Sequence, residues 1–322
     1  MKTSQTLAYH HTLTAKEITD FQNFILRFYQ RHGRHELPWR QTDNPYYILV
    51  SELMLQQTQV NRVIPKYESF ITHFPTVNQL AESNLSQVLT LWQGLGYNRR
   101  AKFLWQLAAV LTKNTLKTTQ IEFPRTQEEL IQLPGIGPYT ASAIVTFAYN
   151  QPTMVLETNI RTVFLHHFFP NTSDIPDSAV KTLITETLYQ TNPREWYWAL
   201  MDYGSYLKKT IPNPSRKSKH HTKQSTFKGS LRQVRGEIIK LLILQEKNHA
   251  TQSDKLGLSK QELQQKITGN KIHLDEALQQ LIAENLIIEK LALETVMNQN
   301  LDLEKQKTQD LYAQNSTQYV LP

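Results

Sequence analysis

The sequence predicts an all-α domain over its first two thirds, followed by a smaller domain of three helices and a strand. Apolar residues recur every three or four positions along most of the chain, the spacing of amphipathic helices. Capping boxes, in which Ser or Thr precedes Glu by three positions, mark helix starts at Thr14, Thr126 and Ser259. No stretch before residue 280 alternates clearly enough for a strand. With 322 residues, 39% of them hydrophobic and 20% charged, the chain has room for two domains.

The first domain is predicted over residues 1–209 as a series of helices. Its first helix follows Thr14 and carries Phe21 and Ile25 on one face. A loop bracketed by prolines leads into a strongly apolar helix over residues 47–63. We expect further helices over residues 78–92, 100–113, 126–133, 139–149, 159–169, 178–190 and 194–208.

A polar, basic, proline-containing stretch predicts a linker over residues 210–230, and residues 231–322 predict a second domain. Three helices followed by a strand over residues 285–288 resemble a winged-helix module. The helix that would be the recognition helix of such a module carries Asp275 and Glu276 but no Lys or Arg. We therefore expect a structural role, or contact with a protein partner, rather than reading of a DNA groove.

The composition excludes several classes of chemistry. The chain has no cysteine, so it cannot form disulfides, use a thiol nucleophile or bind an iron–sulfur cluster through thiolates. We expect no metal and no cofactor. The N-terminus lacks the apolar core of a signal peptide, and no apolar run is long enough to span a membrane. These features predict a cytoplasmic protein of bacterial type with no membrane contact.

Positive charge is concentrated in one segment. The net charge is +7, yet residues 208–235 hold nine Lys and Arg and no Asp or Glu, so the rest of the chain is slightly acidic. A contact with nucleic acid and a solvated basic linker explain this run equally well.

The sharpest motif is Leu-Pro-Gly-Ile-Gly-Pro-Tyr-Thr at residues 133–140. One predicted helix ends before it, and the next begins near Pro138, where the missing N–H is not needed. Gly135 and Gly137 allow positive φ and close approach of a ligand. Because N–H groups at a helix N-terminus attract phosphate, the turn fits a grip on a nucleic-acid backbone. An ordinary tight helix–helix turn fits the residues as well.

Residues 133–140, with the small-residue helix 141–148 that follows, resemble the hairpin of the HhH-GPD DNA glycosylase superfamily. Two more blocks, residues 37–60 with Leu-Pro-Trp-Arg and Ser-Glu-Leu-Met-Leu-Gln-Gln-Thr, and residues 92–97 with Trp-Gln-Gly-Leu-Gly-Tyr, resemble its adenine DNA glycosylases. The resemblance covers about residues 15–207. It implies two helical modules with the active site between them. We expect one over residues 46–151 and one pairing residues 1–45 with 152–209.

The resemblance implies three catalytic positions. Glu52 would be the general acid that protonates the purine ring, since burial in an apolar helix keeps a carboxyl protonated; a solvent-reaching glutamate is the ordinary alternative. Glu157 would stabilise the oxocarbenium-like transition state near C1′. Tyr139 stands where bifunctional members carry a Schiff-base lysine, which implies a monofunctional glycosylase without efficient strand cleavage.

The resemblance also implies contacts with DNA and with the flipped base. Gln57 would fill the gap that the flipped base leaves in the stack, although an exposed helix glutamine is the ordinary alternative. Trp39 and Leu55 would line the base pocket, and simple core packing explains them almost as well. The predicted DNA-binding residues are Gln57, Gly135, Gly137, Thr140, Lys208, Lys209, Arg216 and Lys217. The predicted base-pocket residues are Trp39, Leu55, Asn159 and Trp198.

Four departures from the family's pattern bear on function. Glu157 replaces an aspartate, and its additional methylene admits a weakened or non-catalytic protein. Trp198 lies where adenine-specific members place a polar Glu or Gln. Lys208 stands at the position of the first cluster cysteine, so the basic loop after it replaces the cluster loop. The C-terminal region does not look like the family's domain that recognises 8-oxoguanine.

The predicted partner is double-stranded DNA with a mispaired or damaged base, bound by a monomer associated with the bacterial nucleoid. The first interpretation is excision of adenine opposite 8-oxoguanine or guanine. The same chemistry on thymine or uracil opposite guanine is the alternative that Trp198 leaves open. A DNA-binding relative without catalysis is the alternative that Glu157 leaves open.

Overall fold

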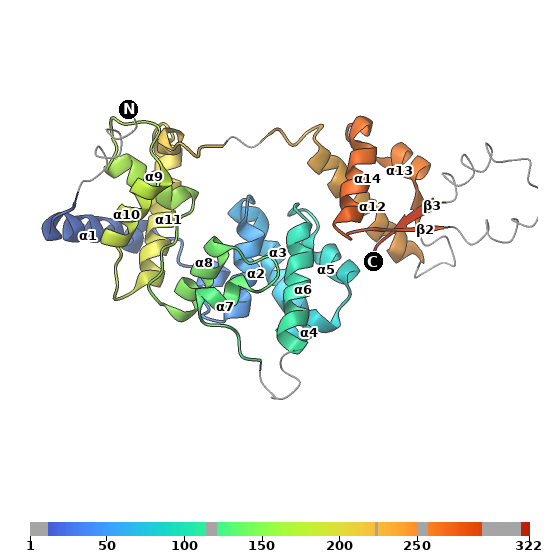
Figure 1. Cartoon of the computed structure of the whole chain (residues 1–322), viewed down its shortest axis with the longest axis horizontal. Helices are drawn as coiled ribbons and strands as arrows, with labels where there is room; N and C mark the ends of the chain where they lie inside the picture. The colour runs from blue at the N-terminus through green and yellow to red at the C-terminus, as the bar shows by residue number, and fades with distance from the viewer. Residues whose placement is uncertain (1–11, 114–120, 223–224, 250–256, 292–316) are drawn as a thin grey trace, which may run out of the picture. The chain divides into compact units, whose positions relative to one another are not determined.

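The computed structural model describes residues 12–113, 121–222, 225–249, 257–291 and 317–322. By contact, the chain divides into two compact units (Figure 1). Unit 1 comprises Met1–Glu52 and Glu122–Lys223, and unit 2 comprises Leu53–Ile121 and Gln224–Pro322. Each unit is built from two separate pieces of the chain. This division does not follow the predicted module boundaries, which stay a prediction.

Unit 1 is entirely helical in its described part. Helix α2 begins in this unit and ends three residues beyond it. The helices are α1 (Ala15–His32), η2 (Pro38–Arg40), α2 (Pro45–Leu55), α7 (Gln127–Ile131), α8 (Pro138–Tyr149), α9 (Thr158–His167), α10 (Asp177–Glu186), α11 (Pro193–Thr210) and η3 (Pro214–Lys217).

The core of unit 1 forms where α11 packs against both α1 and α9. Aromatic rings fill this contact: Phe21 of α1 lies 5.7 Å from Phe164 and 5.8 Å from Trp196, measured between ring centroids. A buried ion pair closes the same region, with Arg40 Nη1 2.7 Å from Asp202 Oδ2. Helices α1 and α11 thus lie together although they are far apart in sequence (Figure 1).

Unit 2 combines four helices of the first domain with the C-terminal module. The former are α3 (Val60–His73), α4 (Val77–Glu82), α5 (Leu85–Trp92) and α6 (Arg99–Lys113). The C-terminal module contains α12 (Leu231–His249), β1 (Leu258–Ser259), α13 (Lys260–Lys266), η4 (Lys271–His273), α14 (Leu274–Ala283), β2 (Ile288–Leu291) and β3 (Thr317–Val320).

The strands of the C-terminal module form an antiparallel sheet in the order β1-β3-β2. Ile288 pairs with Val320, and Leu258 pairs with Tyr319. Three helices with a small sheet agree with the predicted winged-helix-like arrangement. The expectation of no strand before residue 280 is wrong, because β1 has only two residues and is too short to show alternation, and β3 was not predicted. The expected strand over residues 285–288 begins only at Ile288, because Asn285, at φ 48°, ends the preceding turn.

Two predicted helices are each broken in two. The helix expected over residues 47–63 ends at Leu55 and restarts at Val60, with Gln57 between them in the left-handed region at φ 54°. The helix expected over residues 78–92 breaks at Ser83, where Asn84 caps α5 through a capping box with Gln87. Apolar residues keep a helical spacing across the second break, so their periodicity could not reveal it. At the first break the polar run over residues 56–59 interrupts the spacing, but no glycine or proline marks it.

The first part of the predicted linker is folded onto unit 1. Residues 214–217 form η3, Ser215 is buried, and Ile175 pairs with Ser218 as an isolated bridge. A basic segment that packs in this way is a structured loop rather than a free tether. No helix among the described residues has the length and apolar character needed to cross a membrane.

Candidate active site

The candidate general acid, Glu52, is buried in unit 1 next to the hairpin. Helix α2 is apolar on all sides and is packed into the interior, so the one acid in it is only 7% exposed. The Tyr139 hydroxyl donates to Glu52 Oε2 at 3.0 Å. Tyr139 is in the first turn of α8, directly after the hairpin. The structure therefore brings together two of the three predicted catalytic residues.

Burial dominates the acidity of this pair. Loss of solvation raises the pKa of Glu52 from 4.5 to about 7, the Tyr139 hydrogen bond opposes this, and the nearby Glu157 charge adds to it. Burial also raises the pKa of the Tyr139 phenol well above 10. Glu52 is therefore protonated in a substantial fraction of molecules near neutral pH, and Tyr139 stays a neutral donor.

Glu157 caps the N-terminus of α9. Its Oε1 accepts hydrogen bonds from the backbone N–H groups of Asn159, at 2.7 Å, and Ile160, at 2.8 Å. Burial has the largest effect and raises the pKa of the Glu157 carboxyl, while these N–H groups, together with Lys208 and Arg161, oppose that rise. Because an N-cap prefers an anion, the helix favours the ionised form of this side chain. The two carboxyls thus have different surroundings.

The hairpin turn depends on Gly135, which adopts φ +76°. The side chain of Ile136, the next residue in the turn, is buried. Gly137 does not use the positive φ that a glycine allows: it is extended, at φ −95°, and serves as the N-cap of α8. A Cβ atom at Gly137 would meet nothing within 4 Å. Its side of the turn is open, while Thr140 is buried in the following helix.

Trp198 is held by its neighbours. Its ring stacks on Phe147 with centroids 6.1 Å apart, and the Arg40 guanidinium lies 5.4 Å from its centre. Arg40 is itself fixed by Asp202, with contacts of 2.7 and 3.0 Å. Trp198 is half-buried and Trp39 is buried, both within unit 1. Trp198 is therefore an ordered aromatic surface next to a buried cation.

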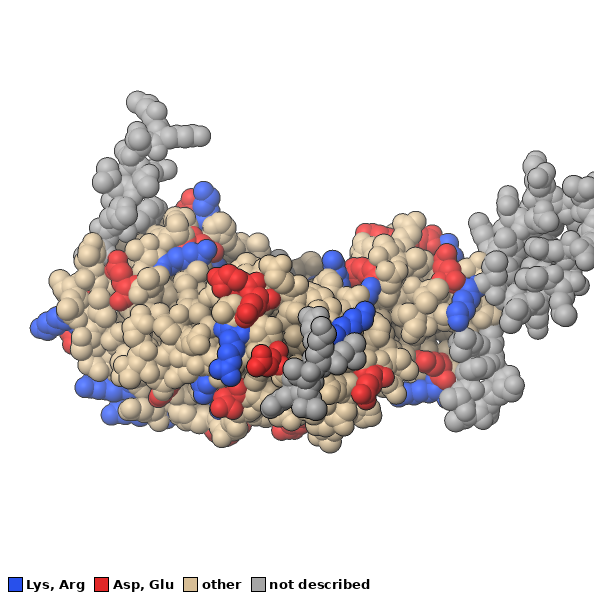
Figure 2. All heavy atoms as spheres, turned by 60° about the horizontal axis from the view of Figure 1, so that its bottom comes forward, with Lys and Arg blue, Asp and Glu red and all other residues tan. Residues whose placement is uncertain are grey.

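The four predicted cations of the basic segment fall into two pairs. The Lys208 amine donates to Asn159 Oδ1 at 2.8 Å, and the Lys217 amine donates to the carbonyls of Phe169 and Pro170 at 2.9 and 2.7 Å. By contrast, Lys209 and Arg216 are exposed. On the face drawn in Figure 2, Lys and Arg are interspersed with Asp and Glu rather than gathered in one broad patch.

The candidate wedge, Gln57, belongs to unit 2. It is exposed, and its Oε1 accepts from the Tyr97 hydroxyl at 2.5 Å. Leu55 is half-buried at the end of α2. The buried Arg100 guanidinium binds the carbonyls of residues 53, 54 and 56 from one side and those of residues 95 and 96 from the other. This cation fixes the turn that presents Gln57.

Three residues of structural importance were not singled out from the sequence. Arg40 and Asp202 form the buried ion pair of unit 1, and Arg100 organises the Gln57 turn. Asp202 could have been suspected, as an acid on the buried face of an amphipathic helix. Nothing in the local pattern distinguishes Arg100 from its neighbour Arg99.

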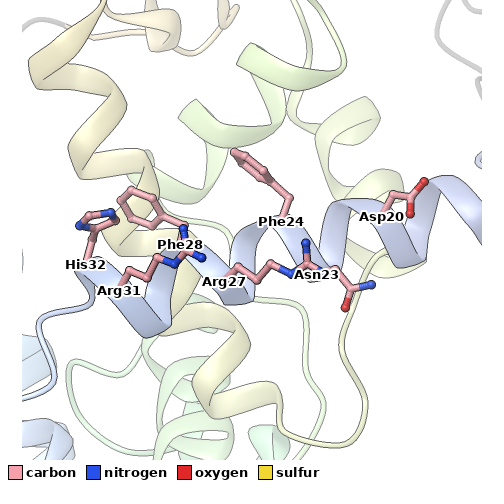
Figure 3. A pocket seen from close by; sticks show the side chains of 7 residues that line it. All are labelled: Asp20, Asn23, Phe24, Arg27, Phe28, Arg31 and His32. Atoms are coloured by element: carbon pink, nitrogen blue, oxygen red, sulfur yellow. The ribbon is translucent and has the colours of Figure 1, made fainter.

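A groove of about 370 Å³ runs along α1 (Figure 3). In the described part of the chain it is lined by Asp20, Asn23, Phe24, Arg27, Phe28, Arg31 and His32. Phe24 and Phe28 pack against Tyr203 of α11 at 5.3 and 4.9 Å. The groove shares no residue with the group formed by Glu52, Tyr139 and Glu157.

The ligand set for an iron–sulfur cluster is lacking in this chain, because it has no cysteine. The described ranges hold no group of three or more acidic or histidine side chains placed to bind a metal ion. Lys208, at the expected position of the first cluster ligand, is an ammonium that donates to an amide.

Comparisons with known proteins agree with the predicted family. Residues 50–188 match a family model described as "HhH-GPD superfamily base excision DNA repair protein". A curated adenine DNA glycosylase of Buchnera aphidicola subsp. Baizongia pistaciae is 38% identical over 191 residues, 58% of this chain and 52% of its own. One of Mycolicibacterium smegmatis is 42% identical over 140 residues, 43% of this chain and 46% of its own. The chain spans about half the length of these curated relatives.

A solved structure of a thermostable thymine-DNA glycosylase has a TM-score of 0.54 at 24% identity, over 62% of this chain and 91% of its own. This likeness shows the fold alone. The predicted fold class is thereby confirmed: residues 50–188 and the helices around them form a helix-hairpin-helix DNA glycosylase fold. The predicted resemblance is confirmed too, to the HhH-GPD superfamily and, within it, to the adenine DNA glycosylases.

Proposed function

We propose that this chain is a base-excision repair glycosylase that hydrolyses the N-glycosidic bond of a mispaired base in double-stranded DNA. The base is adenine, as the names of the curated relatives suggest. We propose 8-oxoguanine or guanine as the base opposite it. One observation carries the proposal: Glu52 is a buried carboxyl with a pKa near 7, and Tyr139 of the hairpin helix hydrogen-bonds to it. A general acid that acts at neutral pH needs these properties.

In the proposed reaction, protonated Glu52 donates its proton to a purine ring nitrogen of the flipped adenine. The bond between C1′ and the base breaks, and its electron pair leaves with the base. The positive charge that develops on the sugar is offset by the Glu157 carboxylate. Water then forms a bond to C1′ and releases a proton to solvent, which yields an abasic site. Tyr139 donates to Glu52 and fixes its orientation; as a phenol it forms no imine, so the enzyme is monofunctional.

DNA contacts are assigned in the same proposal. The open side of Gly137 admits a phosphate, which Gly135 and Thr140 of the same hairpin flank. The exposed cations Lys209 and Arg216 bind the backbone, and Gln57 enters the base stack when the target is flipped.

The identity of the base depends on the pocket. Its proposed residues are Trp39, Leu55, Asn159 and Trp198. The indole N–H is the only polar group of the Trp198 side chain, which favours the second candidate, thymine or uracil opposite guanine. By contrast, a Glu52 carboxyl that is protonated near neutral pH suits protonation of a purine ring. We therefore propose adenine as the first candidate for the excised base.

We further propose that the enzyme acts as a monomer without a cofactor, next to the nucleoid of a bacterial cytoplasm. The C-terminal module would contact a protein partner rather than DNA. The proposed division of the chain is a glycosylase domain over residues 1–209, a basic linker over 210–230 and a C-terminal module over 231–322. Within the glycosylase domain, one helical module covers residues 46–151 and the other pairs residues 1–45 with 152–209.

The proposal is tested by one panel of duplexes containing A opposite 8-oxoguanine, A opposite G, T opposite G, or U opposite G. After incubation, hot alkali cleaves the strand wherever a base has been lost. Alkali-dependent cleavage of the adenine strands is the expected result. Cleavage confined to the strands with T or U supports the second candidate. If no duplex is cleaved, the protein binds DNA but does not catalyse this reaction.

A further inference from the structure

Lys208 connects helix α11 to the Glu157 carboxylate through one amide side chain. Its amine donates to Asn159 Oδ1 at 2.8 Å. On the other side, Asn159 Nδ2 donates to Glu157 Oε2 at 3.3 Å, and the Asn159 backbone N–H donates to Oε1 at 2.7 Å. An ammonium, an amide and a carboxylate thus form a continuous hydrogen-bonded chain.

The backbone of α11 is shaped for this contact. Gly204 lies one helical turn before Lys208, so both residues are on the same face of the helix. A Cβ atom at Gly204 would lie 2.1 Å from the Asn159 carbonyl oxygen and 2.6 Å from its carbonyl carbon. Any other residue would push α11 away from the start of α9. The glycine therefore permits the close approach that brings the Lys208 amine to Asn159.

The charge of Lys208 is directed at Glu157. The other cation that lowers the Glu157 pKa, Arg161, is already bound by both oxygens of Asp177 at 2.8 Å. Among the described residues, Lys208 makes no carboxylate salt bridge of its own, and Glu157 is the acid that raises its pKa against the effect of burial. A half-buried ammonium in this position offsets the cost of an ionised carboxylate nearby.

We propose that Lys208 is a positioning residue for base excision: acting through Asn159, it fixes the Glu157 carboxylate and keeps it ionised. The longer glutamate is then held at the place where charge develops on the sugar. This inference rests on the proposed function. It also assigns Lys208 a role other than the phosphate contact expected from its place in the basic segment.

The test compares Lys208→Met, Lys208→Arg and Lys16→Met. Lys208→Met keeps the length of the side chain and removes its charge, and Lys208→Arg keeps the charge. Lys16→Met removes one exposed charge from α1 of the same unit and is the control. Single-turnover excision is measured between pH 5 and 9 on the duplex that the wild-type protein cleaves, and DNA affinity is measured as a function of salt.

We expect Lys208→Met to slow excision by roughly tenfold to a hundredfold, the effect of a misplaced reacting group. Without the cation Glu157 is harder to ionise, so the acidic limb of the pH profile moves to higher pH. DNA affinity and its salt dependence remain near those of the wild type. Lys208→Arg restores most of the rate, and Lys16→Met excises at the wild-type rate.

Two results would overturn the inference while leaving the proposed function in place. One is wild-type excision and an unchanged pH profile in Lys208→Met. The other is weaker DNA binding with a smaller salt dependence and an unchanged rate once DNA is saturated, which would make Lys208 a phosphate contact. Borohydride trapping of a covalent complex that Lys208→Met abolishes would also overturn it, since the amine would then be a nucleophile.

A readout that needs no activity is the coupling between Lys208 and Glu157 in unfolding. Thermal unfolding midpoints are measured at pH 8 for Lys208→Met, Glu157→Gln and the double variant. We expect the double variant to lose less than the sum of the two single variants. Additive changes would overturn the electrostatic link itself. Absence of excision in the wild-type protein, with coupling present, would instead overturn the proposed function and the catalytic role that rests on it.

Discussion

Glu52 and Glu157 illustrate how two carboxyls of one unit acquire different surroundings. Glu52 has a hydroxyl as its partner and is enclosed by apolar side chains, which favours the protonated acid. Glu157 accepts hydrogen bonds from two backbone N–H groups at a helix N-terminus, and the Lys208 ammonium is connected to it through Asn159. These contacts favour the anion. Burial raises the pKa of both carboxyls, and for Glu157 the N–H groups and nearby cations oppose that rise. Neighbours that differ in this way are what the proposed acid and charge stabiliser require.

The first prediction concerns the acid. Glu52→Gln should lower the rate of base excision by about 10²–10⁴, the usual contribution of a general acid, while DNA binding persists. Glu68→Gln, an exposed change on α3, is the control and should leave the rate unchanged. Single-turnover excision at pH 6.5 (about the pH where the acid is protonated) measures both. Excision by the Glu52→Gln protein at the wild-type rate would remove Glu52 from this role.

The second prediction is a pH dependence of stability. Because the folded-state pKa of Glu52 is raised from 4.5 to about 7, the folded protein favours the protonated form. Its contribution to stability is therefore full below pH 4.5 and is lost as the pH rises through about 7. The loss is on the order of 3 kcal/mol at most, at about 1.4 kcal/mol per pKa unit.

This loss is measured by thermal unfolding of the wild-type and Glu52→Gln proteins. The midpoint of the wild type should fall relative to that of Glu52→Gln between pH 5 and pH 8 (about the window of the shift). A constant difference across that range would mean that Glu52 titrates normally in the folded state.

The third prediction concerns Tyr139. With a phenol rather than an amine at this position, the enzyme should remove the base and leave the strand intact until alkali is added. Borohydride added to enzyme and substrate should trap little covalent complex. Tyr139→Lys should increase trapping, with Tyr149→Lys, on the same helix, as control. Efficient trapping by the unchanged protein contradicts the assignment.

At the scale of elements, Gly204 is the residue that decides how α11 meets α9. Gly204→Ala should destabilise the protein by about 1–3 kcal/mol, since the new Cβ collides with backbone that cannot easily yield. Gly236→Ala, inside α12 with nothing within 4 Å, should instead stabilise by about 0.5–1 kcal/mol through helix propensity. Denaturant unfolding of the two variants should give opposite signs.

Helix existence could be predicted from the sequence, while helix breaks and long-range contacts could not. Capping boxes at Thr14, Thr126 and Ser259 correctly placed three helix starts, because a cap is a local interaction. The break at Gln57 has no glycine or proline to announce it. It depends on Arg100, a residue far along the chain.

The candidate site shows the same limit. Burial of Glu52 follows from the apolar helix around it, and its pairing with Tyr139 joins two motifs that the sequence had already singled out. The contact between Lys208 and Asn159 depends on the packing of α11 against α9, which no local pattern encodes. For the same reason the basic segment looked uniform in the sequence, although its cations differ in the structure.

At the scale of the whole molecule, DNA affinity should depend on the exposed cations of that segment. Neutralising Lys209 and Arg216 together should weaken binding to all sequences alike and reduce the slope of log K against log[salt] by about 0.9 for each lost contact. Neutralising Lys217, whose amine is held by two carbonyls, should change the slope little. Binding isotherms at several salt concentrations measure the slopes. Equal slopes for the wild-type protein and the two variants would mean that the segment is a linker without phosphate contacts.

The division of unit 1 into two pieces of chain has a consequence for synthesis. A nascent chain that has emerged from the ribosome as far as α10 already contains Glu52, Tyr139 and Glu157 but not α11. Until α11 follows, Arg40 lacks its carboxylate partner Asp202, and the aromatic face of α1 can pack against α9 but not against α11. Such intermediates expose the kind of surface that chaperones bind, and distant contacts of this sort form slowly. The group of Glu52, Tyr139 and Glu157 thus reaches its final packing late, after the chain has made most of the helices that surround it.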